Sequence, residues 1–235
     1  MNKRIERIRN EERKYHEACY DNYQLFEEGS WLHKPVKTVM DTLSNFDYMN
    51  KLIVLDLGCG VGRNSIPIAE TLKTRSGKVV CIDLMQAALN KLLRYSHKYG
   101  VSDYMETYLS DIGEYNISDK EFDYIIAVSA LEHVESELKF TQVLEKMVRG
   151  TKDRGINCII MNTNIQEIDI STSTELEPLI ELNMTTDRSK ELLSRAYEGW
   201  EVNYTTVKSL AFNIERNERE ILLKSDCITY VVQRR

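Results

Sequence analysis

The most distinctive chemical arrangement in this sequence is a glycine-rich loop that follows a short apolar run at residues 52–56. The run ends in Asp56, and three glycines then occupy alternate positions: Gly58, Gly60 and Gly62. We expect a buried strand, a loop and a helix over residues 63–72, a unit that binds nucleotide-like ligands in open α/β folds. A dinucleotide fingerprint would need a glycine where the chain has Arg63 or Ser65, so the loop predicts a different ligand.

Acidic residues end the next two expected strands, over residues 78–82 and 105–110. Asp83 follows the first strand and Asp111 follows the second. In an open α/β sheet, ligands bind beyond the carboxyl ends of the strands, where a carboxylate accepts hydrogen bonds from both hydroxyls of a ribose. We therefore expect Asp83 to hold a ribose, and Asp111 to accept from an exocyclic amine beside the backbone N–H of Ile112.

The fourth expected strand, residues 122–128, is followed by Ser129 and His133. Both residues would face the reacting atoms of a bound ligand. His133 is the best-placed candidate for a general base, because imidazole titrates near neutral pH. A structural histidine packed at the start of a helix is the competing interpretation.

Strands alternate with helices through most of the chain, which is typical of a doubly wound, mostly parallel α/β sheet. The remaining elements are expected at residues 85–99, 136–148 and 186–197 for helices and 156–161, 201–212 and 221–232 for strands. The last two strands are separated by a short gap at residues 215–218, and this gap predicts an antiparallel hairpin.

We expect one domain over residues 1–235. Within it, residues 1–49 form an N-terminal helical cap and residues 50–165 form the cofactor-binding core. Residues 166–235 contain a substrate-side insert, a helix and the C-terminal β hairpin.

Two segments suggest roles beyond the sheet. Residues 1–27 carry a thin apolar stripe at helical spacing, and this amphipathic helix is either a lid over the site or a fixed packing helix. The alternation of strand and helix patterns stops over residues 162–185, which are rich in polar side chains. A polar stretch of this length inside a domain usually has a function, and this one follows a strand on the ligand side.

Composition excludes several classes of protein. The 235-residue chain has a net charge of −6 and a pI of about 5.4, with no basic stripe to follow a phosphate backbone, so nucleic acid is an unexpected partner. Five cysteines lie far apart without C-x-x-C spacing, which predicts reduced thiols and a cytoplasmic location. No apolar run reaches membrane-spanning length, and no grouping has the spacing of a metal site.

The acidic residue, the glycine triplet and the two later carboxylates together resemble the class I methyltransferases that use S-adenosylmethionine (SAM). Residues 62–65 (GRNS), residues 198–201 (EGWE) and the final hairpin are similar to the bacterial tellurite-resistance methyltransferases. This resemblance implies a Rossmann-like sheet of seven strands in the order 3-2-1-4-5-7-6, mostly parallel with the last strand antiparallel, and helices on both faces. The insert after strand five and the entry segment, residues 31–35, depart from those enzymes.

The resemblance also implies which residues hold the ligands. The cofactor-binding residues would be Asp56, Gly58, Cys59, Gly60, Gly62, Asn64, Asp83, Leu84, Asp111, Ile112 and Ser129. Apart from the resemblance, we expect the substrate to lie against Tyr23, Trp31, His33, Arg63 and His133. No Asp/Asn-Pro-Pro-Tyr motif follows the fourth strand, and in this superfamily its absence disfavours methylation of amide or base nitrogens.

The function expected from these residues is transfer of a methyl group from SAM to a small molecule by in-line displacement, which gives S-adenosylhomocysteine (SAH). Alternatives are a methyltransferase for RNA or protein, a non-catalytic SAM-binding regulatory protein and, third, a dehydrogenase. The oligomeric state is open. If Asp83 holds the ribose, Asp83→Ala should weaken SAH binding and leave the unliganded melting temperature near that of the unaltered chain.

Overall fold

The structure is a computed structural model that describes residues 3–216 and 219–235. Its elements alternate in the expected α/β order. Part of the expected gap at residues 215–218 lies outside the described residues. The strands on either side of it reach Arg216 and begin again at Arg219.

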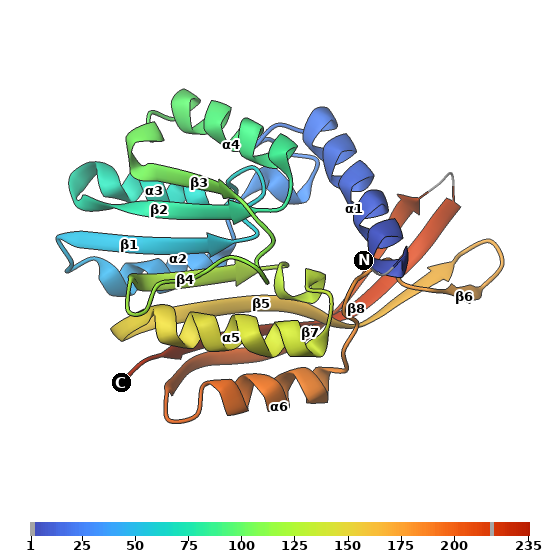
Figure 1. Cartoon of the computed structure of the whole chain (residues 1–235). Coiled ribbons are helices and arrows are strands. Elements are labelled where there is room, and N and C mark those ends of the chain that lie inside the picture. Colours follow the sequence, from blue (N-terminus) through green and yellow to red (C-terminus); the bar gives the residue numbers. More distant parts are fainter. Residues whose placement is uncertain (1–2, 217–218) are drawn as a thin grey trace.

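A single mixed sheet forms the centre of the molecule (Figure 1). Its strands are β1 (Lys51–Leu57), β2 (Ser76–Asp83), β3 (Met105–Leu109), β4 (Phe122–Val128), β5 (Thr151–Asp169), β6 (Thr174–Leu176), β7 (Glu201–Arg216) and β8 (Arg219–Gln233). The order is β3-β2-β1-β4-β5-β8-β7, with β8 antiparallel to β5, so the predicted order and the antiparallel last strand are confirmed. The prediction of seven strands is corrected to eight, because the short β6 also pairs with β5.

Helices cover both faces of this sheet, as the sequence predicts (Figure 1). The α-helices are α1 (Lys3–Asn22), α2 (Lys37–Leu43), α3 (Ser65–Thr71), α4 (Gln86–Lys98), α5 (Glu137–Gly150) and α6 (Thr186–Ala196). Short 3-10 turns lie at Trp31–His33, Ser44–Phe46, Leu72–Thr74, Ser102–Tyr104 and Leu131–His133. Successive residues of a strand point to opposite faces, so Val54 packs in the core under α2, α3 and α4, and Leu55 packs in the core under α5 and α6.

Strand β5 differs most from expectation. The sequence predicts that this strand ends at Met161 and that a polar stretch follows, but β5 continues to Asp169. The extension exists because β8 pairs with β5 from Ile156 opposite Gln233 to Asp169 opposite Ile221, with a register shift between Thr163 and Gln166. The first part of the supposed insert is therefore sheet, and residues 170–185 contain only β6 as regular structure.

Helix α1 lies across the carboxyl ends of the central strands, between α4 and the outer part of the β7–β8 hairpin (Figure 1). Ion pairs attach it on both sides. The Nζ of Lys91 on α4 is 2.7 Å from Asp21 Oδ1, and the guanidinium of Arg216 on β7 is 3.5 Å from Glu12 Oε1. The helix thus rests on the edge of the sheet where parallel α/β folds bind their ligands.

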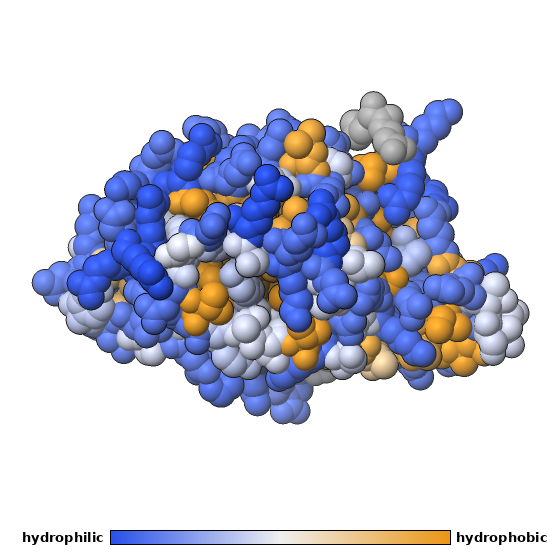
Figure 2. All heavy atoms as spheres, turned by 90° about the horizontal axis from the view of Figure 1, so that it is seen from below, coloured by the Kyte–Doolittle hydropathy of each residue, from blue (hydrophilic) through white to orange (hydrophobic). Residues whose placement is uncertain are grey.

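The surface is mostly hydrophilic on the face seen from below in Figure 2, with apolar side chains scattered over it. Over residues 3–216 and 219–235, no helix has the length and apolar character needed to cross a bilayer.

Candidate functional site

The glycine loop joins β1 to α3 and rests on the end of β2. The backbone N–H groups of Gly58 and Cys59 donate to the carbonyl oxygen of Ile82 at 2.8 and 3.0 Å. Gly58 has a φ of +74°, and a Cβ there would lie 2.6 Å from the Cβ of Ala130. Only glycine combines that backbone conformation with contact against the loop after β4, which explains the residue type at this position.

Asp56 is buried below this loop. Its carboxylate accepts a hydrogen bond from the hydroxyl of Ser65 at the start of α3. Burial raises the pKa of Asp56 to about 7, with a smaller contribution from the charge of Asp83, although the Ser65 hydrogen bond opposes the shift. Asp56 therefore titrates in the physiological range.

The start of α3 departs from the prediction. The helix begins at Ser65 instead of residue 63, because residues 59–62 still form the loop and Gly62 N donates to Cys59 O. The side-chain oxygen of Asn64 accepts from the backbone N–H of Val36 at 3.0 Å. Asn64 thus attaches the loop to the segment before α2.

Asp83 at the end of β2 connects the loop to the next helix. Its Oδ2 accepts from Gly60 N and its Oδ1 accepts from Met85 N, both at 2.8 Å. Burial raises the pKa of Asp83 above its usual range, and the two backbone hydrogen bonds limit the shift. The neighbouring Leu84 is 45% exposed, so its side chain is open to contact.

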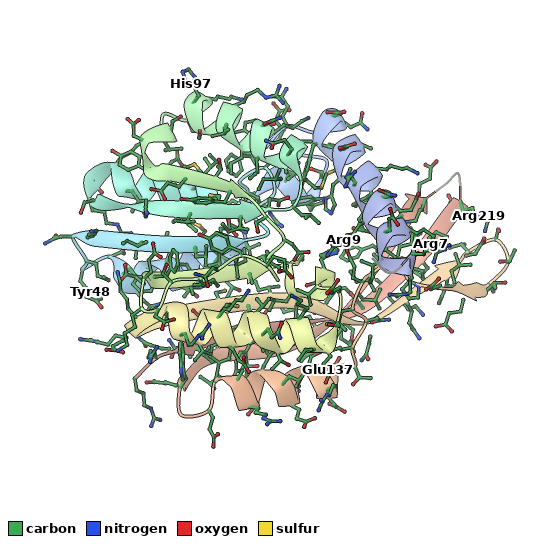
Figure 3. The ribbon with its side chains drawn as sticks, viewed as in Figure 1. Arg7, Arg9, Tyr48, His97, Glu137 and Arg219 are labelled. Atoms are coloured by element: carbon green, nitrogen blue, oxygen red, sulfur yellow. The ribbon has the colours of Figure 1, made fainter. Side chains whose placement is uncertain are left out.

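Asp111 after β3 already has a cationic partner. Its Oδ1 accepts from Gly113 N at 2.8 Å, and its Oδ2 accepts from the guanidinium of Arg9 at 2.7 Å. Ile112 beside it is buried. In Figure 3, Arg9 extends from α1 toward the carboxyl edge of the sheet, and Arg7 lies nearer the β6 side.

Four chemically active residues of α1 follow helical spacing along the side that faces the strand ends: Arg9, Glu12, His16 and Tyr20. Glu12 is 3.6 Å from His16, and the Tyr20 hydroxyl lies 3.2 Å from the position of a Cβ on Gly60. The helix therefore covers the glycine loop and the end of β3 together. Sequence reasoning singled out the apolar residues of this segment and missed this polar stripe, although its spacing of three and four residues was readable.

His133, at the end of the turn after β4, is held by a residue from the distant insert. Its Nδ1 lies 2.9 Å from Oε2 of Glu181, whose side chain is only 3% exposed. Burial alone would lower the pKa of His133, but the hydrogen bond and charge of Glu181 raise it to about 9. Glu132 and Glu12 add to that shift. No sequence motif marks Glu181, which lies 48 positions from His133.

Ser129, which precedes that turn, takes a left-handed backbone conformation with a φ of +49°. Its N–H donates to the carbonyl oxygen of Ile160 on β5 at 2.8 Å. This bend directs the chain after β4 across the end of the sheet, beside Gly58 and its neighbour Cys59.

The expected substrate residues fall into two groups. Trp31 packs beside Tyr20, with ring centroids 6.2 Å apart, and the guanidinium carbon of Arg63 lies 5.7 Å from the Trp31 ring. Trp31 and Arg63 thus adjoin α1 next to the glycine loop. His33 is 3.8 Å from Glu28, and Tyr23, which is 39% exposed, lies against Gly29.

No group of three or more His, Cys, Asp or Glu side chains with metal-binding geometry occurs within the described part of the chain. The carboxylates of Asp83 and Asp111 at the strand ends accept hydrogen bonds, which suits an organic ligand with hydroxyl and amine groups.

Residues 54–155 match the sequence model of a family described as "Methyltransferase domain". The chain contains a methyltransferase domain. Structural likeness agrees with this family: TehB from Haemophilus influenzae superposes with a TM-score of 0.65 at 19% identity, over 85% of this chain and 62% of that one. A SAM-dependent methyltransferase from Methanosarcina mazei gives a TM-score of 0.60 at 15% identity, over 85% and 98% of the two chains.

Sequence relatives of this methyltransferase domain are more informative about chemistry. A ubiquinone biosynthesis O-methyltransferase of Rickettsia conorii is 29% identical over 119 residues, which cover 50% of this chain and 38% of the relative. The Rickettsia typhi enzyme of the same name is 26% identical over 179 residues, which cover 74% and 69%. The chain therefore spans less than half the length of the first of these relatives.

Proposed function

We propose that this protein transfers the methyl group of SAM to an oxygen atom of a small molecule and releases SAH. The observation that carries the proposal is the hydrogen bond between Gly60 N and Asp83 Oδ2, at 2.8 Å, which fixes the glycine loop against the carboxylate at the next strand end. Similarity to enzymes named O-methyltransferases supports oxygen as the acceptor.

The cofactor would lie along the carboxyl ends of β1, β2 and β3. The glycine loop, with Asp56 beneath it, would receive the amino-acid end, because Gly60 allows atoms to approach its backbone closely. Asp83 would accept from the ribose hydroxyls with its remaining lone pairs, since a carboxylate has about four acceptor sites. Asp111 would accept from the adenine amine and Ile112 N–H would donate to the ring, once Arg9 leaves Asp111.

The chain's own contribution to the reaction would be positioning. A sulfonium supplies a methyl group that already has a good leaving group, so most of the acceleration comes from aligning the acceptor and excluding water. Helix α1 and Trp31 cover the loop on the solvent side, which supports a role in that exclusion. Arg63, stacked on Trp31, would contact the acceptor.

Reduced thiols support a cytoplasmic setting as part of this proposal. The five cysteines are all free, and Cys19, Cys59, Cys81 and Cys158 are buried. Disulfides are the usual mark of proteins that work in oxidising compartments.

Calorimetric titration tests the cofactor directly. SAM and SAH should bind, and NAD should not, because the third glycine of a dinucleotide fingerprint is missing. NAD binding tighter than SAH binding would overturn the proposal. A search for SAH formation with a panel of small hydroxyl compounds, with RNA and protein as comparison substrates, then separates small-molecule methylation from its alternatives.

A further inference from the structure

The contact between His133 and Glu181 joins the turn after β4 to a segment far along the chain. Glu181 is almost fully buried, and its two carboxylate oxygens face different cations: Oε2 lies 2.9 Å from His133 Nδ1, and Oε1 lies 3.5 Å from Arg9 Nε. Two hydrogen bonds fix the backbone of this segment, one from the guanidinium of Arg4 to Glu181 O at 3.1 Å and one from Leu182 N to Glu132 O at 3.0 Å. The carboxylate is thus held in place independently of His133.

His133 is close to the proposed reaction centre. The turn that carries it begins beside Ala130, which touches Gly58 of the glycine loop. Its charge also acts on the carboxylate of Asp83, where it is one of the smaller contributions that oppose the rise in pKa caused by burial. The side chain is 31% exposed, so the ring is accessible to a ligand as well as to solvent.

We propose that Glu181 is a positioning residue that orients His133 as the proton acceptor for an acidic hydroxyl group of the substrate, a phenol or a comparable ring hydroxyl. Nδ1–H of His133 donates to Glu181, which leaves the lone pair of Nε2 free to face the acceptor. A carboxylate behind an imidazole fixes the tautomer and stabilises the imidazolium that forms. The inference rests on the proposed function, because it names the acceptor for that same site.

The proton and the electrons balance without a further reactant. The hydroxyl proton passes to Nε2 of neutral His133, and a lone pair of the oxygen forms the new O–CH3 bond. The S–CH3 bond breaks, and its electron pair stays on sulfur as SAH forms. The imidazolium then loses its proton to solvent through its exposed edge.

The acidity of the acceptor distinguishes a phenol from an aliphatic hydroxyl. A hydrogen bond and a full negative charge from Glu181 raise the pKa of His133 to about 9, with smaller contributions from the charges of Glu132 and Glu12. Phenols ionise near pH 10, so proton transfer from a phenol to this imidazole is nearly balanced, whereas an aliphatic hydroxyl is far less acidic.

Two measurements on the whole chain test the proposal. Isotope-labelled histidine allows NMR to follow the four imidazoles through a pH titration. His133 should titrate near pH 9 with hydrogen on Nδ1, and Glu181→Gln should move its titration down by about two pH units, toward the ordinary value near 6.5. Glu175→Gln, which alters an exposed acid on β6, is the matched control and should change nothing.

Methyl transfer is then followed as SAH formation with phenol, catechol and 3,4-dihydroxybenzoate, and with benzylamine as the amine probe. We expect turnover of a phenol with kcat/KM rising until about pH 9, an inflection that Glu181→Gln moves to lower pH. His133→Asn should lower kcat on the order of 100-fold, because that is a typical contribution of a positioned base. Calorimetry should give unchanged SAH affinity for both variants, which shows that they are folded.

The measurements separate three statements: the role of Glu181, the class of acceptor, and the proposed function itself. An unchanged inflection or an unchanged His133 titration in Glu181→Gln would overturn the role of Glu181. Methylation of benzylamine, or of none of the phenols, by protein that binds SAM would overturn the acceptor class. Failure of the unaltered protein to bind SAM or SAH would instead overturn the proposed function.

Discussion

Asp83→Ala tests the connection between the glycine loop and the second strand. The side chain accepts two backbone hydrogen bonds at 2.8 Å, one from the loop and one from the residue before α4. Each buried N–H left without an acceptor costs about 1–3 kcal/mol. Removing the buried carboxylate recovers part of that cost, so we expect a net loss of about 3 kcal/mol in the free energy of unfolding.

A loss of this size is measurable by thermal denaturation. For a chain of this length, 1 kcal/mol shifts the melting temperature by about 2–4 °C, so the variant should melt roughly 6–12 °C lower without ligand. The sequence alone predicts no such loss, because it places Asp83 at the ligand and does not reveal the two backbone donors. The ribose contacts would be lost as well, at about 2–4 kcal/mol, which weakens SAH binding roughly 30-fold or more.

Asp103→Ala is the matched control, because Asp103 is an exposed acid in the 3-10 turn before β3. It should change neither the melting temperature nor the SAH dissociation constant by more than experimental error. An unchanged melting temperature in Asp83→Ala would refute the structural role of the two hydrogen bonds. Unchanged SAH affinity would refute the cofactor role.

Three further expectations concern helix α1, as a lid over the strand ends, and the buried carboxyl group of Asp56. Arg9→Met should tighten SAH binding about tenfold in calorimetry, because it removes the cation that competes with the adenine amine for the carboxylate of Asp111. Arg7→Met on the same helix is the control. Equal or weaker SAH binding in Arg9→Met would contradict this competition. Amide hydrogen exchange in residues 10–34 should slow when SAH is added, and by more than in α5; equal exchange rates with and without SAH would mean that α1 is a fixed packing helix. The pKa of Asp56 is raised to about 7, so its contribution to stability is complete below pH 4 and lost as the pH rises through 7. Asp56→Asn should therefore gain stability relative to the unaltered chain between pH 4 and 8 in denaturant titrations, and a difference independent of pH would contradict the shift.

Local patterns were enough to predict the centre of the fold. The alternation of apolar runs with amphipathic helices predicts a parallel sheet, and the topology of that sheet brings the residues that follow its strands to one edge. Gly58, Asp83 and Asp111 could be placed in this way without any knowledge of their partners.

Contacts across long separations could not be predicted from those patterns. Glu181 reaches His133, and Arg9 reaches Asp111, through the packing of α1 and the insert against the sheet edge. The length of β5 depends in the same way on β8, because residues 162–169 look polar and irregular until a partner strand satisfies their backbone groups. The sequence revealed the apolar stripe of α1, whereas the structure shows that a polar stripe on the same helix faces the strand ends.

Strand β7 has a consequence for the behaviour of the chain in concentrated solution. It forms the outer edge of the described sheet over 16 residues, and it exposes Tyr204 and Phe212 at 48% and 53%. An exposed edge strand of this length is a template for pairing with another copy. Lys208 lies midway between the two rings on the same face, so an antiparallel pair of edges centred there would place two ammonium groups opposite each other. This repulsion works against pairing through β7, so a residue remote from the proposed ligand site contributes to solubility at high concentration.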